Sequence, residues 1–204
     1  MRRTMLIGLV VALAAGAVAR AQNGRVASPP GASATQVGGT YDVRAGNVGG
    51  KWLEVRYGRP IKRGRDLFGP ADYVDFLNDG APVWRAGANV TTRLNTEAPL
   101  VIGGQTIAPG EYTLFIDLQP DPWMLVVSTW PAQTTYSDEN KQALWGAYDY
   151  TPDRDVVRAR MTRETLPYSF DQLTWEFLNV NETGGRLAMI WDTQIAWVPF
   201  TVKD

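Results

Sequence analysis

Apolar and polar residues alternate along much of the chain, and this two-residue period is the pattern of half-buried β-strands. Between residues 52 and 57, for example, Leu53 and Val55 fall on one face while Glu54 and Arg56 fall on the other. The same period, or a short apolar run, predicts strands in several later segments: residues 90–94, 100–102, 105–107, 112–118, 123–129, 156–161, 173–178, 187–191 and 195–202.

Glycine and proline separate these segments. Gly103-Gly104 is a two-residue turn that favours a hairpin between its flanking segments. Residues 70–77, which begin with proline, favour a short helix or turn, and residues 137–144, which begin with Ser137 and two acids, favour a short helix. The pattern predicts an all-β, single-domain antiparallel β-sandwich of about nine or ten strands with one or two short helices, and a closed barrel is the alternative.

The N-terminus has the pattern of an export signal. Two arginines precede an apolar run over residues 5–18, and Ala19-Arg20-Ala21 supplies the small residues that signal peptidases require. This run is shorter than the roughly 20 residues that span a bilayer as a helix. We therefore expect export to the periplasm or the exterior, with no membrane span after signal cleavage.

Cleavage before Gln22 would divide the chain into three regions. These are a signal peptide at residues 1–21, a flexible lead-in at 22–39 and a β-sandwich domain at 40–204. The lead-in is expected to be flexible because it is rich in glycine, serine and proline.

Charge and composition exclude several classes of function. Loss of the three arginines in residues 1–21 lowers the basic count from 20 to 17 against 21 acids, a net charge of −4. This balance argues against nucleic-acid binding. The chain has no histidine and no cysteine, so it has no Ser-His-Asp triad, histidine-bearing zinc site, disulfide or lipoprotein anchor. We expect no cofactor and no metal.

The strongest candidate for a site is the stretch of residues 57–89, which mixes arginines with aromatic residues. Arginine offers a planar fork for carboxylate or phosphate, and aromatic faces stack on sugars. The alternative, which we favour, is a structural role in which the arginines pair with nearby aspartates or cap loop carbonyls. The candidate binding residues are Tyr57, Arg59, Arg65, Trp84, Arg85 and Asn89.

Acidic residues suggest two weaker hypotheses. Asp149, Asp153 and Asp155 offer oxygen ligands to calcium, although a solvated loop is the favoured interpretation. A glycosidase-like pair would need two of Glu111, Asp117 and Asp121 about 5–10 Å apart. Trp123, Trp130 and Trp145 near turns are further candidates for stacking on sugars, with core packing favoured.

The order of several short motifs resembles the bacterial domain of unknown function 2911 family. These motifs are YGRP at residues 57–60, VWRAGAN at 83–89, IGG at 102–104, PGEYTLF at 109–115 and VPFT at 198–201. The resemblance implies a secreted or envelope β-rich domain with no established activity, so it supplies no catalytic residues. The chain departs from the family pattern at residues 40–51, which resemble an insertion, and at Val90, where an acidic residue is more common.

The sequence therefore favours a non-catalytic binding or structural module of the bacterial envelope. Its expected partner is a glycan or a small anionic ligand, and the oligomeric state is left open. The alternative is a histidine-free hydrolase or lyase that uses carboxylates and arginine.

Overall fold

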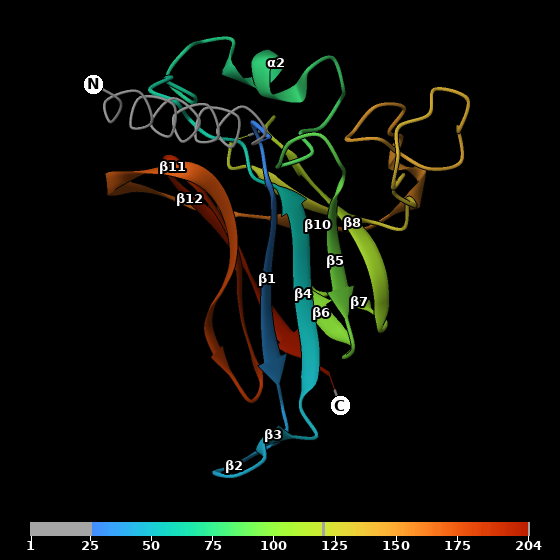
Figure 1. The fold of residues 1–204 in the computed structure, drawn as a ribbon, viewed down its shortest axis with the longest axis vertical. Helices are drawn as coiled ribbons and strands as arrows, with labels where there is room; N and C mark the ends of the chain where they lie inside the picture. The colour runs from blue at the N-terminus through green and yellow to red at the C-terminus, as the bar shows by residue number, and fades with distance from the viewer. Residues whose placement is uncertain (1–25, 120, 204) are drawn as a thin grey trace, which may run out of the picture.

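The structure is a computed structural model in which residues 26–119 and 121–203 are described. Two large antiparallel sheets make up most of the molecule, and a third, two-stranded sheet projects from one end (Figure 1). The predicted signal peptide, residues 1–21, lies outside the described residues, so its cleavage stays a prediction.

The first large sheet has six strands in the order β1-β4-β5-β8-β9-β10. Every neighbouring pair in this order is antiparallel. The strands are β1 (Pro30–Val37), β4 (Lys51–Gly58), β5 (Thr92–Thr96), β8 (Gly110–Asp117), β9 (Met124–Ser128) and β10 (Asp155–Arg160).

The second large sheet has four strands in the order β11-β12-β6-β7. Its main part is the long hairpin of β11 (Thr162–Asn181) and β12 (Gly184–Val202), whose register shifts near Phe170. The short strands β6 (Leu100–Ile102) and β7 (Gln105–Ile107) form the hairpin that Gly103-Gly104 predicts.

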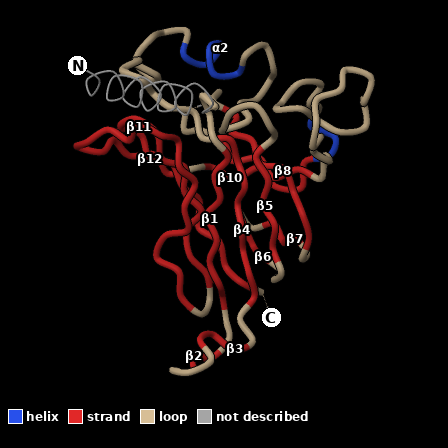
Figure 2. The backbone as a smooth tube through the Cα atoms, in the orientation of Figure 1, coloured by secondary structure: helices blue, strands red, loops and turns tan. Residues whose placement is uncertain are grey.

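The remaining elements lie at the two ends of the sheets. Strands β2 (Thr40–Asp42) and β3 (Gly46–Val48) form the small sheet, and they lie at the opposite end from helix α2 (Tyr73–Asn78) (Figure 2). A 3-10 turn over Pro152–Arg154 precedes β10.

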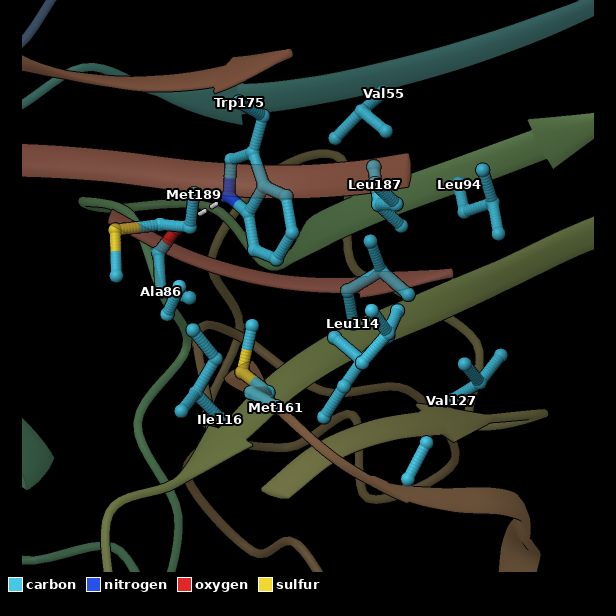
Figure 3. Close-up of a cluster of buried hydrophobic side chains, with 14 of the residues drawn as sticks. Val55, Ala86, Leu94, Leu114, Ile116, Val127, Met161, Trp175, Leu187 and Met189 are labelled. Atoms are coloured by element: carbon cyan, nitrogen blue, oxygen red, sulfur yellow. Dashed lines mark hydrogen bonds between the residues drawn. The ribbon is translucent and has the colours of Figure 1, made fainter. Parts of the chain in front are cut away.

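The main core lies between the two large sheets, because the alternating apolar faces of both point toward it. Val55, Leu94 and Leu114 of the first sheet gather with Trp175 and Leu187 of the second (Figure 3). All five are buried. An indole inside such a core needs a partner for its N–H group, and Trp175 donates to the Ala86 carbonyl at 2.9 Å (Figure 3).

A second, smaller core lies on the outer face of the six-stranded sheet. Phe115 and Val126 point outward there, yet both are fully buried. Residues 129–154, which we call the covering loop, bring Leu144 and Tyr150 onto them. This cover explains why the middle of the sheet is apolar on both faces instead of strictly alternating.

The all-β prediction is confirmed, but several details differ. The described residues contain twelve strands rather than nine or ten. Residues 187–191 and 195–202 belong to one strand, β12, rather than two. The helix expected over 137–144 is wrong, because the covering loop uses turns and bends there. Of the helix or turn expected over 70–77, the structure has the helix, which is α2.

The flexible lead-in predicted for residues 22–39 is also wrong where the structure describes it. Residues 30–37 form β1, which pairs along its whole length with β4. Small residues suit this position because Arg59 crosses over Gly31, where a Cβ atom would lie 2.3 Å from the Arg59 Cδ atom.

No helix among the described residues is long and apolar enough to cross a membrane.

Candidate functional site

A pocket of about 450 Å³ lies where the covering loop meets the open part of the six-stranded sheet. Strands β1, β4 and β5 supply one side, and residues 132–134 of the covering loop supply another. We call it the outer pocket. Its lining is Pro30, Gly31, Ala32, Arg56, Tyr57, Val90, Thr91, Arg93, Ala132, Gln133 and Thr134.

Two arginines are the only charged residues in this lining. Arg56 of β4 and Arg93 of β5 are directly opposite each other in the antiparallel register. Opposed side chains on one face lie about 5 Å apart at their Cβ atoms, and like charges in that position are destabilising. The pocket therefore has a paired cationic side.

Both arginines are also held by acids. Arg56 forms a salt bridge with Glu54 at 2.9 Å, and Arg93 forms one with Glu111. Burial lowers the pKa of Arg93, and the nearby Arg56 lowers it further. The two acids pair with the guanidinium groups, but neither acid lines the pocket.

The covering loop supplies a firmly held wall. Gln133 is buried, and its side-chain nitrogen lies within 3.1 Å of the carbonyl oxygens of Ser137, Asn140 and Ala143. The hydroxyl of Thr91 lies 3.0 Å from the Leu144 carbonyl oxygen. The wall is thus fixed by hydrogen bonds within the protein.

The six residues predicted for the site do not gather in one place. Tyr57 lines the outer pocket, but it is 3% exposed and its hydroxyl faces the Trp175 carbonyl at 3.5 Å. Arg59 instead donates to the Leu173 carbonyl and to the hydroxyl of Thr174. Arg59 therefore links the two large sheets.

Arg65 serves its own loop. Its guanidinium group donates to the carbonyls of Lys62 and Ile61 at 2.9 and 2.8 Å. It also lies 5.9 Å from the centroid of the Phe76 ring. This is the carbonyl-capping role that the structural interpretation anticipated.

Trp84 belongs to the main core. It is 2% exposed and stacks on Trp191 with ring centroids 6.0 Å apart. Its backbone exchanges two hydrogen bonds with Ile116, each 2.9 Å long. A side chain in this position has no face to offer a sugar.

Arg85 joins α2 to the covering loop. It pairs with Asp79, just after α2, at 3.5 Å, and its guanidinium lies 5.9 Å from the centroid of the Tyr148 ring. The Tyr148 hydroxyl donates to the same Asp79 carboxylate at 2.6 Å. Asn89 is an exposed turn residue with a left-handed φ of 63°.

Sequence reasoning missed the cationic pair of the outer pocket. The alternation placed Arg56 on the outward face of its strand, and Arg93 follows the same logic. Nothing in the local sequence shows that the two strands are neighbours or that these residues are in register. Only the pairing of β4 with β5 brings them together.

The acids of the hydrolase hypothesis have structural partners. The three proposed carboxylates are each paired with an arginine: Glu111 with Arg93, Asp117 with Arg158, and Asp121 with Arg163. Among the described residues, no group of three acidic side chains is placed to hold a metal ion.

A hydroxyl, an amine and a carboxylate also meet between β11, β12 and the loop after β4. Asp192 is buried, and it accepts hydrogen bonds from Lys62 and from Ser169, the latter at 2.8 Å. Lys62 lies 3.1 Å from the Ser169 hydroxyl. A lysine activates a serine only when it can take up a proton, whereas Lys62 serves here as the cation of a salt bridge.

Neither a curated protein nor a solved structure matches the chain. A family model described as "Protein of unknown function (DUF2911)" matches residues 40–200. The match begins after β1 and spans every strand from β2 to β11 and most of β12. The chain therefore belongs to the DUF2911 family.

Proposed function

We propose that this protein is an exported binding module of the bacterial envelope that takes a small organic anion in the outer pocket. The observation that carries the proposal is the opposition of Arg56 and Arg93 across β4 and β5 at the side of that pocket. The export-signal pattern of the N-terminal sequence supports the proposed location.

An anion bound between the two guanidinium groups would add to the charge compensation that Glu54 and Glu111 already give them. Each guanidinium can offer two parallel N–H groups to a carboxylate or phosphate. The salt bridges with Glu54 and Glu111 hold the guanidinium groups from outside the lining. The partly buried Arg93 therefore meets the ligand already oriented, which reduces the entropy cost of binding, whereas the exposed Arg56 is held less firmly.

The rest of the lining favours an anion with an apolar body. Pro30, Ala32, Val90 and Ala132 present carbon atoms, while Thr134 offers a hydroxyl group. Pockets that bind organic ligands combine mostly apolar walls with a few placed polar groups. Octanoate combines a carboxylate with an apolar body, whereas acetate and inorganic phosphate have no apolar body.

The test is calorimetric titration of the protein lacking residues 1–21 with octanoate, acetate and inorganic phosphate. We expect octanoate to bind most tightly. The double variant Arg56→Gln/Arg93→Gln should bind it at least about tenfold more weakly, since a hydrogen bond to a charged group contributes about 1.5–3 kcal/mol.

Arg160→Gln is the matched control, because Arg160 is an exposed arginine of β10 in the same sheet but outside the pocket lining. It should leave octanoate affinity unchanged. Equal affinity in the double variant and the control would refute the proposal, and so would equal binding of octanoate and uncharged octanol.

A further inference from the structure

A second cleft, of about 160 Å³, opens within the covering loop. We call it the aromatic cleft because three aromatic side chains contribute to its lining. The lining is Gln133, Tyr136, Ser137, Asp138, Lys141, Ala143, Trp145, Tyr148 and Asp149. Gln133 is the one residue that it shares with the outer pocket.

The backbone around this cleft is held in place by the protein itself. The side-chain amide of Gln133 accepts from the Ser137 N–H at 2.7 Å and reaches the Ala143 carbonyl at 2.9 Å. Its backbone N–H donates to the Leu144 carbonyl at 2.8 Å. These bonds join the two sides of the loop, so the cleft exists before any ligand arrives.

Two of the rings form a corner. The centroids of Tyr136 and Trp145 are 5.9 Å apart, and their planes are inclined at 63°. Tyr136 is 59% exposed and Tyr148 is 41% exposed, although both are large and partly apolar. Inclined aromatic walls around a small space are the arrangement that receives quaternary ammonium groups, because each ring face attracts positive charge.

The charges of the lining favour a cation. Asp138 and Asp149 face one lysine, Lys141, so the lining has an excess of one negative charge. Lys141 is held by Asp149 at 2.8 Å, and this hydrogen bond raises the pKa of Lys141. The charge of Asp138 also raises the pKa of Lys141, but no salt bridge joins Asp138 to any of the described residues, and its exposed carboxylate can also meet a ligand.

We infer that the aromatic cleft binds a small organic cation with a methylated ammonium group, seated in the Tyr136–Trp145 corner with Asp138 as its counter-ion. The site is distinct from the outer pocket, and its ligand has the opposite charge. The inference therefore does not depend on anion binding by Arg56 and Arg93.

The test compares choline with 3,3-dimethyl-1-butanol, in which an uncharged carbon replaces the ammonium nitrogen. Both are titrated into the protein lacking residues 1–21 at constant ionic strength, and binding is followed by ligand NMR. We expect choline to bind about tenfold more tightly than its neutral isostere, because desolvated cation–π contacts contribute up to about 2 kcal/mol. Equal binding of the two would overturn the inference.

Two exposed residues of the cleft can be changed without disturbing the core. Tyr136→Leu should weaken choline binding at least fivefold, and Asp138→Asn should weaken it severalfold. Tyr168→Leu is the matched control, since Tyr168 on β11 is 60% exposed and lies outside the cleft. The same loss of affinity in Tyr168→Leu and Tyr136→Leu would contradict the site.

Two further measurements separate this inference from its alternatives. The double variant Arg56→Gln/Arg93→Gln should bind choline normally, whatever its effect on octanoate. Glucose should not compete with choline. Binding of glucose without binding of choline would show a saccharide site instead and would overturn the cationic ligand.

Discussion

Arginine has two different roles in this protein. Arg59, Arg65 and Arg85 donate to carbonyls or acids within the fold, and they hold together the sheets and loops around them. Arg56 and Arg93 also pair with acids, but they lie side by side on an outward face and line a pocket. Residue type alone does not separate these roles, because a guanidinium suits a backbone carbonyl as well as it suits a ligand oxyanion.

Tryptophan shows the same division at the residue scale. Trp84 is 2% exposed and stacks on Trp191, whereas Trp52 on β4 is 48% exposed. Burial rather than residue type therefore determines what each indole contributes to stability.

We predict that Trp84→Ala lowers the free energy of unfolding by about 3–5 kcal/mol, because it removes buried contacts and leaves a cavity. Urea unfolding followed by circular dichroism measures this change. Trp52→Ala provides the comparison and should change stability by less than about 1 kcal/mol. A similar small change for Trp84→Ala would show that Trp84 is not part of the core.

At the scale of elements, β1 is a strand that its amino-acid composition does not predict. Glycine, serine and alanine dominate it, yet it pairs with β4 over eight residues from Pro30–Val37. Beyond the strand, the Pro29 carbonyl accepts a hydrogen bond from Arg59. The family match begins only at residue 40, so β1 completes the sheet from outside the matched region.

We predict that a chain beginning at Thr40 melts about 3–12 °C below one that begins at Ala27. Burial of Val37 at the end of β1 contributes about 1.5–3 kcal/mol, and each kcal/mol shifts the melting temperature of a domain this size by about 2–4 °C. Differential scanning calorimetry of the two chains gives the comparison. Equal melting temperatures would mean that β1 contributes no net stability.

The covering loop is the second element that local sequence patterns do not predict. It folds back over Phe115 and Val126, which would otherwise expose an apolar patch on the sheet. It also supplies walls to both the outer pocket and the aromatic cleft. One irregular segment therefore stabilises the sheet and forms both candidate sites.

At the scale of the whole molecule, a partly buried ion pair connects the two large sheets. Lys62 follows β4 of the first sheet, and Asp192 lies in β12 of the second. Burial tends to raise the pKa of Asp192, but hydrogen bonds from Lys62 and Ser169 outweigh it and leave that pKa below its usual value. A carboxylate with a depressed pKa stabilises the fold above its unfolded pKa and loses this contribution as pH falls.

We predict that Asp192→Asn destabilises the protein by about 3 kcal/mol at pH 7, because the Lys62 ammonium, which is poorly exposed, then lacks its counter-ion. Its stability should also fall less steeply than that of the parent protein as the pH decreases below about 4. Urea unfolding at a series of pH values measures both effects. Asp149→Asn breaks an exposed pair with Lys141, so it should change stability far less than Asp192→Asn does.

Much of the strand content follows from sequence because alternation is a local property. The apolar face of β4 and the Gly103-Gly104 hairpin are both confirmed. The misjudged segments are those where distant contacts override local composition. Residues 30–37 become a strand by pairing with β4, and residues 137–144 are held as a loop by Gln133.

The sequence by itself determined the all-β class, the absence of histidine and cysteine chemistry, and the family motifs, since each depends on residue type and near neighbours. Only the tertiary structure decided which residues share a site. It placed Trp84 in the core, committed Arg59 and Arg85 to internal contacts, and brought Arg56 opposite Arg93. The physical reason is that strand order and register set distances between residues far apart in the chain, and local patterns contain no information about those distances.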